Sequence, residues 1–367
     1  MSAPADTPVR ERRFRFALLA LIALLPLVYV PRLACGARQD GPSPREPQWV
    51  HTVLVTAARI EPGTFEQPGS ELAALIRKGS LVRSLWATSA DPRAAAASLW
   101  CGRWPRQLGE LPLPASLPDK HWTLASAVRE AGGATCAIGA PIELPGFDAR
   151  VAASDPEQAG LAAAEFVRAQ RDRRLLVWVH LDWADASSLE SVLAPIGAAL
   201  REARRDYDTL AMVTGFALGP REAPAQSGSC PLATALPAAL FPGRTAEVLL
   251  SQVDVTGLLA AVLQVRQPVA RRGEQPLVSR EQALWGALRG ADGQLPVLVQ
   301  DPTSEQLLLP TADRPASQPT RVRAALPLRG IESIEAWLPG PNGPQRAEGE
   351  QLKSLAKRYF DFAQQAR

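Results

Sequence analysis

The sequence predicts an α/β protein, in which a doubly wound sheet is covered by helices on both faces. Three observations lead to this fold class. Short apolar segments with the composition of strands alternate with amphipathic helical segments. Residues 175–179 (Leu-Leu-Val-Trp-Val) are apolar at every position, as in a central strand whose two faces are both covered. The chain has 367 residues, of which 46% are hydrophobic, so it can bury a sizeable core and is not disordered throughout.

Charge and composition exclude two classes of function. The net charge of +3 is small, and nothing in it calls for a nucleic-acid partner. The sequence contains only three histidines and four lysines, so a His-rich metal site is nearly ruled out. Its 34 prolines indicate many loops and interrupted elements.

The N-terminus has the pattern of an export segment. Residues 10–15 contain four arginines, and the apolar residues 17–30 that follow have the length of a signal-peptide core. This stretch is shorter than the roughly 20 residues that span a bilayer comfortably. Cys35 and Ala37 are small residues suited to cleavage, and Ala34-Cys35 also resembles a bacterial lipoprotein site. A retained membrane or lipid anchor, a cleaved signal peptide and a buried core helix all remain open.

The composition divides the chain into four parts. We expect a signal peptide or membrane anchor over residues 1–37 and a polar, Pro-rich linker over 38–48. An α/β core is expected over residues 49–300. Residues 301–367 form a Pro-rich C-terminal region that ends in an amphipathic helix, and no internal repeat is visible.

Strands and helices alternate through the predicted core. The strand candidates are 52–56, 135–138, 175–181, 209–213, 248–253 and 296–299. The helix candidates are 71–78, 124–131, 156–171, 187–205 and, near the C-terminus, 348–365. Asp155 before Pro156 predicts an N-cap followed by a first-turn proline. Ser187 and Glu190 have the spacing of a capping box.

The three cysteines beyond the export segment match no metal-binding spacing. Export permits disulfides, but Cys101, Cys136 and Cys230 are an odd number, which leaves at least one thiol free. The favoured interpretation is that they are small buried hydrophobic residues.

Several segments, taken in order, resemble the sulfatases of the alkaline phosphatase superfamily. Residues 97–105, Ala-Ser-Leu-Trp-Cys-Gly-Arg-Trp-Pro, resemble the family's "ASLLTGRYP", and Gly146-Phe147-Asp148 matches its recurring "GFD". Further matching segments are 49–57, 71–79, 123–132, 207–214, 242–244 and 253–255. The resemblance implies a sulfatase-like mixed sheet over roughly residues 49–300.

In this family, carboxylates hold a divalent metal, usually calcium, beside a formylglycine nucleophile made from Cys or Ser. The paired Asp residues of the family fall at Thr56 and Ala57 of this chain. Its nucleophile falls at Pro92, and the partner arginine falls at Ala96. None of these side chains supplies the family's anionic ligand or nucleophilic group.

The remaining family positions depart from the pattern as well. The family's Lys and His in "GKWH" become Ala140 and Ile142, and its "DPH" reads Asp182-Trp183-Ala184. The second metal-binding Asp and its neighbour become Phe216 and Ala217. The resemblance therefore implies no catalytic residue, no metal and no cofactor in this chain. Calcium is expected only if the protein is active through other residues.

Few side chains remain as candidates for such an activity. Ser89 and Thr88 are nucleophiles if the loop shifts, or else polar loop residues. His180 is either a hydrogen-bonded core histidine or a catalytic acid. Asp182 and Asp185 follow the central strand, where α/β sheets bind ligands, but they are also suited to capping. Arginines at 171–174 and 201–205 are interpreted as solvated helix ends or as contacts with an anionic glycan or lipid.

Three functions follow from these patterns. The first is an exported, membrane-tethered pseudoenzyme of sulfatase-like fold with a binding or scaffolding role, whose protein or anionic-ligand partner is unknown. The second is an active sulfate- or phosphate-ester hydrolase that uses residues such as Ser89, Asp182 and Asp185. The third is a cell-envelope structural domain with an unrelated α/β fold, which a different strand order would favour.

Overall fold

The computed structural model describes most of the chain after the N-terminal segment. The residues described are 50–219, 229–235, 243–265, 297–302, 304–310, 319–325, 333–340 and 343–365. The expected export segment and linker lie outside these residues. Residues from Pro47 onward form one compact unit. Among the described residues, no helix is both long and apolar enough to cross a membrane.

A nine-stranded mixed sheet forms the centre of this unit. Its order is β4-β3-β5-β1-β6-β7-β2-β8, with β9 also pairing with β2. Strand β7 runs antiparallel to β6 and β2, and the other pairs are parallel. The bounds are β1 His51–Ile60, β2 Ser80–Trp86, β3 Ala134–Ile138, β4 Ala149–Val151, β5 Leu175–Ala184, β6 Thr209–Gly215, β7 Ser229–Ala235, β8 Arg244–Ala246 and β9 Leu250–Ser251.

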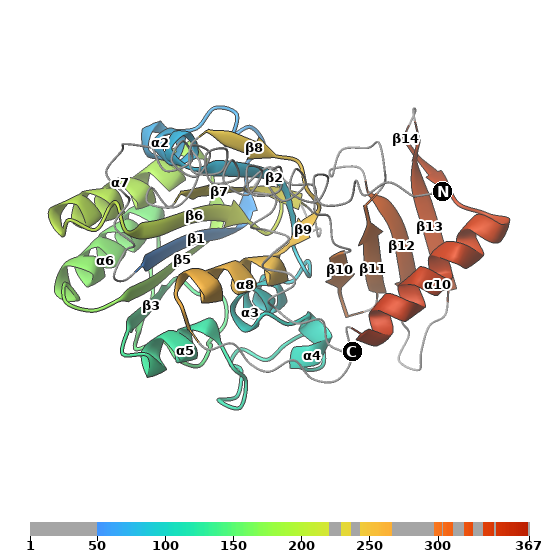
Figure 1. The fold of residues 1–367 in the computed structure, drawn as a ribbon, viewed down its shortest axis with the longest axis horizontal. Helices are drawn as coiled ribbons and strands as arrows, with labels where there is room; N and C mark the ends of the chain where they lie inside the picture. Colours follow the sequence, from blue (N-terminus) through green and yellow to red (C-terminus); the bar gives the residue numbers. More distant parts are fainter. Residues whose placement is uncertain are drawn as a thin grey trace, which may run out of the picture. The chain divides into compact units, whose positions relative to one another are not determined.

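Helices cover both faces of this sheet (Figure 1), so the predicted fold class is confirmed. On one face α2 (Ser70–Lys78), α6 (Pro156–Ala169) and α7 (Ala186–Glu202) pack on Val53, Val177 and neighbouring side chains. On the other face α3 (Pro92–Cys101), α5 (Leu124–Glu130) and α8 (Gln252–Val262) pack on the alternate strand positions, including Leu54 and Trp178. The short helix α4 is Pro105–Leu108.

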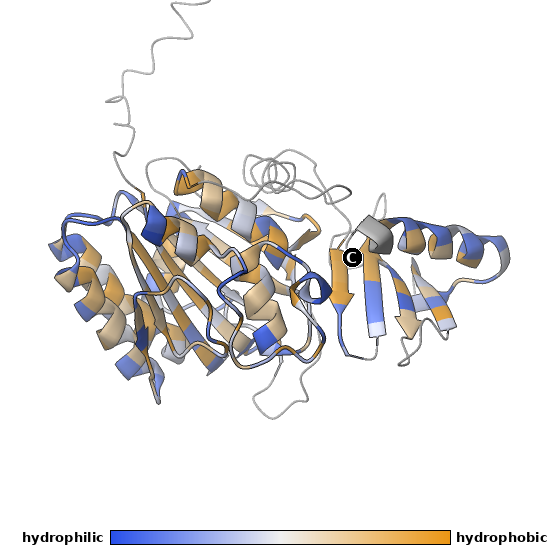
Figure 2. Ribbon diagram, turned by 90° about the horizontal axis from the view of Figure 1, so that it is seen from below, coloured by the Kyte–Doolittle hydropathy of each residue, from blue (hydrophilic) through white to orange (hydrophobic). Residues whose placement is uncertain are grey.

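The C-terminal residues build a second, antiparallel sheet. Its five strands, in spatial order, are β10 Val297–Gln300, β11 Ser304–Leu309, β12 Thr320–Ala325, β13 Ser333–Gly340 and β14 Gly343–Arg346. Helix α10 (Gly349–Gln365) lies on one face of this sheet (Figure 2), where Leu355 and Tyr359 pack against Leu307 and Val322.

The structure corrects several sequence-based expectations. Residues 248–253 are not one strand, because β9 is only Leu250–Ser251 and Ser251 then caps α8. Residues 297–300 are a strand as expected, but β10 pairs with β11 in the second sheet. Sequence patterns gave no indication of β2, β7, α3 or α8, nor of the four strands β11–β14.

The expected capping box at Ser187 is also wrong, for a physical reason. Helix α7 begins one residue earlier, because the Asp185 carboxylate accepts a 2.7 Å hydrogen bond from the Ser188 amide. The freed Glu190 carboxylate instead accepts a 2.9 Å bond from the Glu71 amide and another bond from the Ser70 hydroxyl. A side chain of α7 therefore satisfies one of the unpaired backbone N–H groups at the start of α2.

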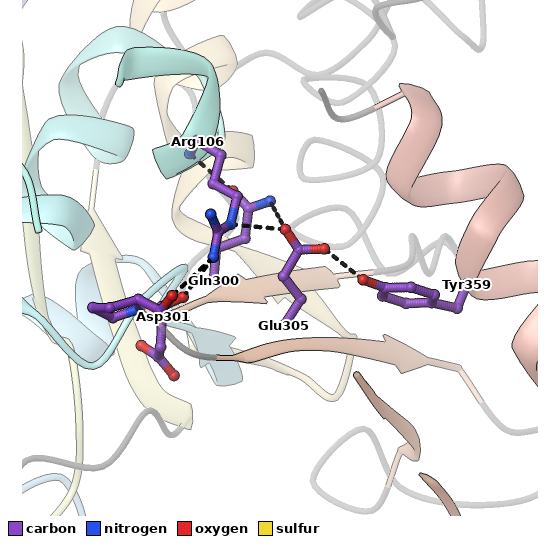
Figure 3. Close-up of polar contacts among 6 residues, drawn as sticks. Arg106, Gln300, Asp301, Glu305 and Tyr359 are labelled. Carbon is purple, nitrogen blue, oxygen red and sulfur yellow. Dashed lines mark hydrogen bonds and ion pairs between the residues drawn. The ribbon is translucent and has the colours of Figure 1, made fainter. Parts of the chain in front are cut away.

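A buried ionic network joins the second sheet to α4 and α10 (Figure 3). The Glu305 carboxylate is fully buried and lies 2.9 Å from the Arg106 Nε atom. It also accepts hydrogen bonds from Gln300 Nε2 at 3.1 Å and from the Tyr359 hydroxyl at 2.6 Å. Both carboxylate oxygens are thus paired, as a buried charge requires.

Candidate functional site

The candidate site lies where the central parallel strands end. Thr56 of β1 is in register with His180 of β5 on one side and with Thr214 of β6 on the other. In open α/β sheets, ligands bind beyond this carboxyl edge. The sulfatase-like positions predicted from the sequence belong to the same edge.

Five of those positions converge there. Thr56 and Ala57 lie in the second half of β1, and the Phe216 amide donates a 2.9 Å hydrogen bond to the Ala57 carbonyl. The Ala217 carbonyl accepts a 2.9 Å bond from the Ile60 amide. Ala140 follows β3, and its side chain packs against the core on the Trp178 face. The preceding Gly139 lies so close to β5 that a Cβ atom there would be 2.4 Å from the His180 carbonyl oxygen.

A hydrogen-bonded chain of three side chains occupies this edge. The Trp178 indole N–H donates to Thr56 Oγ1 at 2.8 Å, and Thr56 Oγ1 lies 2.8 Å from His180 Nδ1. An indole nitrogen only donates, so Thr56 Oγ1 accepts that bond, whereas the direction of its bond with Nδ1 depends on the tautomer of the imidazole. The other ring nitrogen, Nε2, has no hydrogen-bond partner among the described residues.

Aromatic rings surround this imidazole. His180 stacks on Phe216 with centroids 5.4 Å apart and planes inclined by 28°. Trp178 contacts Trp100 at 5.1 Å and Phe147 at 5.8 Å, and both of these rings are buried. Burial lowers the pKa of His180 from 6.5 to about 3, so the ring is neutral near pH 7. This supports the core-histidine interpretation rather than that of a catalytic acid.

The predicted nucleophile position lies in the first turn of α3. Pro92 is the first residue of that helix, which Asp91 caps by accepting a 3.0 Å hydrogen bond from the Arg93 amide. Ala96 is buried in the core. In the preceding loop, Thr88 is buried and its hydroxyl lies 3.4 Å from Gln252 Oε1.

Ser89 is bound to the second sheet. Its hydroxyl donates to Asp301 Oδ1 at 3.1 Å, and the Ala90 amide donates to the same oxygen at 2.9 Å. The cavity that contains Asp182 is not lined by Ser89 or by Asp185. The structure therefore does not assemble the three alternative catalytic residues.

A polar cavity of about 370 Å³ opens beside the imidazole cluster. It lies between the carboxyl ends of β1, β3 and β5 and the N-termini of α6 and α7. Charged, hydroxyl and indole groups line it, among them Arg59, Asp155, Asp182, Trp183 and Ser188. Such a set of hydrogen-bonding groups beside one indole is suited to a polar organic ligand.

Arg59 and Trp183 of this cavity were not among the residues predicted from the sequence. The strand candidates end at residues 56 and 181, whereas β1 continues to Ile60 and β5 to Ala184. Arg59 and Trp183 are paired residues of these extensions. The continued apolar and aromatic residues after Asp182 were the available signal.

The surroundings of the other titratable candidates indicate structural roles. Burial raises the pKa of the thiols of Cys101, Cys136 and Cys230 to about 12, so they remain protonated. In the part of the chain that the structure describes, no three His, Cys, Asp or Glu side chains are placed to hold a metal ion.

The arginine-rich stretches also have structural partners. Arg173 donates to the carbonyls of Gly132 and Gly133, at 3.2 and 2.6 Å, beyond the end of α5. Arg168 and Arg171 both pair with Glu202, at 2.8 and 3.2 Å. Arg171, Arg173 and Arg201 are exposed, as expected for solvated helix ends, but Arg205 is buried, so the interpretation is wrong for Arg205.

Comparisons with known proteins identify structural neighbours only. No protein-family model matches the sequence, and no curated protein matches it significantly. A putative sulfatase from Bacteroides fragilis has a TM-score of 0.64 and 11% identity, covering 90% of this chain and 100% of that chain. A phosphonate monoester hydrolase of Agrobacterium radiobacter has a TM-score of 0.57 and 14% identity, covering 86% of this chain and 96% of that chain.

A third neighbour extends this likeness to the wider superfamily. A protein of the alkaline phosphatase superfamily from Vibrio parahaemolyticus has a TM-score of 0.56 and 12% identity, covering 88% of this chain and 89% of that chain. At such identities the likeness concerns the fold, not the chemistry. The chain has the sulfatase-like fold of the alkaline phosphatase superfamily, as its sequence segments predicted.

Proposed function

We propose that this chain is a non-catalytic member of its fold class, a sulfatase-like pseudoenzyme that binds a ligand or partner without hydrolysing it. The supporting observation is that aromatic rings, not carboxylates, pack against His180 at the carboxyl edge. Phe216 lies at a position where the family has a metal-binding Asp, and it stacks on the neutral His180. An apolar ring offers a hard cation no oxygen ligand.

The neighbouring cavity is the proposed binding site. Asp182 and Arg59 supply hydrogen-bonding groups of both charges, and Trp183 supplies a flat apolar surface. The cavity of about 370 Å³ has the size of a site for a small polar molecule. Binding here needs no nucleophile and no metal.

A hydrolysis assay tests the absence of catalysis. The full chain is incubated with p-nitrophenyl sulfate and with p-nitrophenyl phosphate, adding calcium, magnesium, manganese or zinc in turn. We expect no turnover above that of buffer with any metal, and no difference between the wild type and Asp182→Asn. Metal-dependent turnover that Asp182→Asn or Ser89→Ala abolishes would contradict the proposal and establish the hydrolase alternative.

Membrane tethering is the second part of the proposal, and its support is the sequence of residues 10–37. We expect the full chain to sediment with membranes, and a chain lacking residues 1–37 to remain in the supernatant. Equal sedimentation of the two chains would contradict tethering by this segment without affecting the hydrolysis result. Accessibility of an added C-terminal tag to protease outside the cytoplasmic membrane tests export.

A further inference from the structure

A second cavity lies at the opposite, amino end of the parallel strands. It is a groove of about 110 Å³ between α2 and α7, and it reaches β6 of the large sheet. Leu75, Leu193, Ile196 and Leu200 form its apolar walls. Thr209 is the uncharged polar residue of its lining, and the Thr209 hydroxyl already donates a 2.7 Å hydrogen bond to the Arg205 carbonyl.

Small residues explain why there is a groove here. Ala211 and Ala235 line it from β6 and β7, and Ala74 and Gly197 line it from α2 and α7. Ala211 is partly exposed although it lies in the middle of the sheet, between β1 and β7. Protein interiors are normally packed as densely as organic crystals. The small side chains in the middle of the sheet therefore leave space for an apolar ligand, which such cavities take up more readily than water.

An ion pair crosses the mouth of the groove above Gly197. Arg201 Nη2 and Glu71 Oε1 are 3.8 Å apart, and their side chains are 53% and 30% exposed. A Cβ atom at Gly197 would lie 3.3 Å from Arg201 and 3.4 Å from Glu71, so the glycine leaves room for the pair. Exposed pairs of this kind contribute only about 0–1 kcal/mol. The pair therefore opens at little cost and admits a ligand.

The charges on the rim indicate which ligand fits. Two cations, Lys78 and Arg201, are balanced by two anions, Glu71 and Asp206. The rim therefore attracts neither an anionic nor a cationic head group strongly. We propose that this groove binds the alkyl chain of an uncharged single-chain amphiphile. The site is separate from the carboxyl-edge cavity and does not depend on the proposed function.

Equilibrium unfolding in urea tests the proposal, because a ligand that binds only the folded chain stabilises it. The full chain, kept free of alkyl detergents, is unfolded with and without octan-1-ol. We expect octan-1-ol to raise the unfolding midpoint in proportion to the logarithm of its concentration, and octanoate to raise it less. Ala211→Val, which fills the floor, should weaken octan-1-ol binding by about tenfold, as expected for one or two misplaced methyl groups.

Matched variants make the result decisive. Ala74→Leu fills the groove from the helix and should also lose the ligand effect, which covers the case that Ala211→Val folds poorly. Ala169→Leu adds the same bulk at an exposed position of α6 and should respond to octan-1-ol like the wild type. A wild type without any shift overturns the proposal. An equal shift in Ala74→Leu and Ala169→Leu also overturns it, because octan-1-ol would then bind elsewhere.

Discussion

His180 and Glu305 are both buried titratable groups, but their surroundings are opposite. His180 is neutral, enclosed by aromatic rings, and has one ring nitrogen without a partner. Glu305 is surrounded by Arg106, Gln300 and Tyr359, which pair with both of its oxygens. The side chains packed against His180 are thus less polar than those packed against Glu305. The buried ion pair lies where the second sheet meets α4.

This difference indicates what each region contributes. A fully paired buried charge fixes one geometry, since every alternative leaves a charge unpaired. A neutral imidazole among aromatic rings fixes much less, because only the bond to Thr56 depends on its nitrogen atoms. We expect substitutions at the Glu305 network to be costly and those at His180 to be mild.

The largest effect is expected from Arg106→Ala. This change leaves the Glu305 carboxylate buried without its cation, at a cost of about 3 kcal/mol in the free energy of unfolding. Urea unfolding measures it. Arg83→Ala, which breaks the exposed 3.5 Å pair with Glu247, is the control and should cost less than about 1 kcal/mol. Equal costs for the two variants would show that burial of Glu305 does not matter.

The dependence on pH separates the two regions further. The pKa of His180 is lowered by burial to about 3, and burial and nearby arginines lower that of His51 to about 4. Below about pH 6.5 these histidines are therefore protonated in the unfolded chain but not in the folded chain. The free energy of unfolding consequently falls as the pH falls. Between pH 7 and pH 5, His180 should account for a loss of about 2 kcal/mol. In the His180→Phe variant, urea unfolding over this range should show only the part of the loss that is due to His51.

Tyr359→Phe is expected to have an intermediate effect. It removes the 2.6 Å hydrogen bond from the hydroxyl to Glu305 Oε2 but keeps the ring between α10 and the sheet. A hydrogen bond to a charged group contributes about 1.5–3 kcal/mol. The loss should be independent of pH between 5 and 7, in contrast to that caused by the histidines, and urea unfolding at both values checks this.

The smallest effect is expected from His180→Phe at pH 7. The change breaks the bond between Thr56 and His180, but it also removes a buried nitrogen, Nε2, that has no partner. Thr56 keeps its bond from the Trp178 indole. The loss and the gain offset each other, so the free energy of unfolding should change by less than about 1 kcal/mol. A loss as large as that of Arg106→Ala would contradict the proposed contrast between the regions.

The sequence predicted the fold best where local signals agreed with the tertiary structure. The apolar residues 175–181 form the middle of the sheet, and Asp155 caps α6 as its position before a proline indicates. The capping box predicted at Ser187 and Glu190 does not form. Asp185 caps α7 in its place, and the Glu190 carboxylate accepts a hydrogen bond from α2. A capping pattern does not reveal which helix its second member serves.

The candidate site was predicted only as a set of positions. Thr56, Ala57, Ala140, Phe216 and Ala217 lie together because the ends of parallel strands meet at one edge, which follows from the order of the strands. The aromatic enclosure of His180 was not predictable in this way. It requires Phe216 from the segment after β6 beside Trp178 of β5, and no local pattern joins these rings to His180.

The central position of β1 affects how this chain must be made. Its Thr56 meets His180, a sequence separation of 124 residues, and its other neighbour, β6, follows later still. The ribosome therefore releases β1 long before either of its neighbouring strands has been made. Contacts so distant in sequence slow folding, and unpaired strands aggregate. During synthesis, β1 therefore stays unpaired while the chain between Thr56 and His180 is made, and it depends on chaperones during that time.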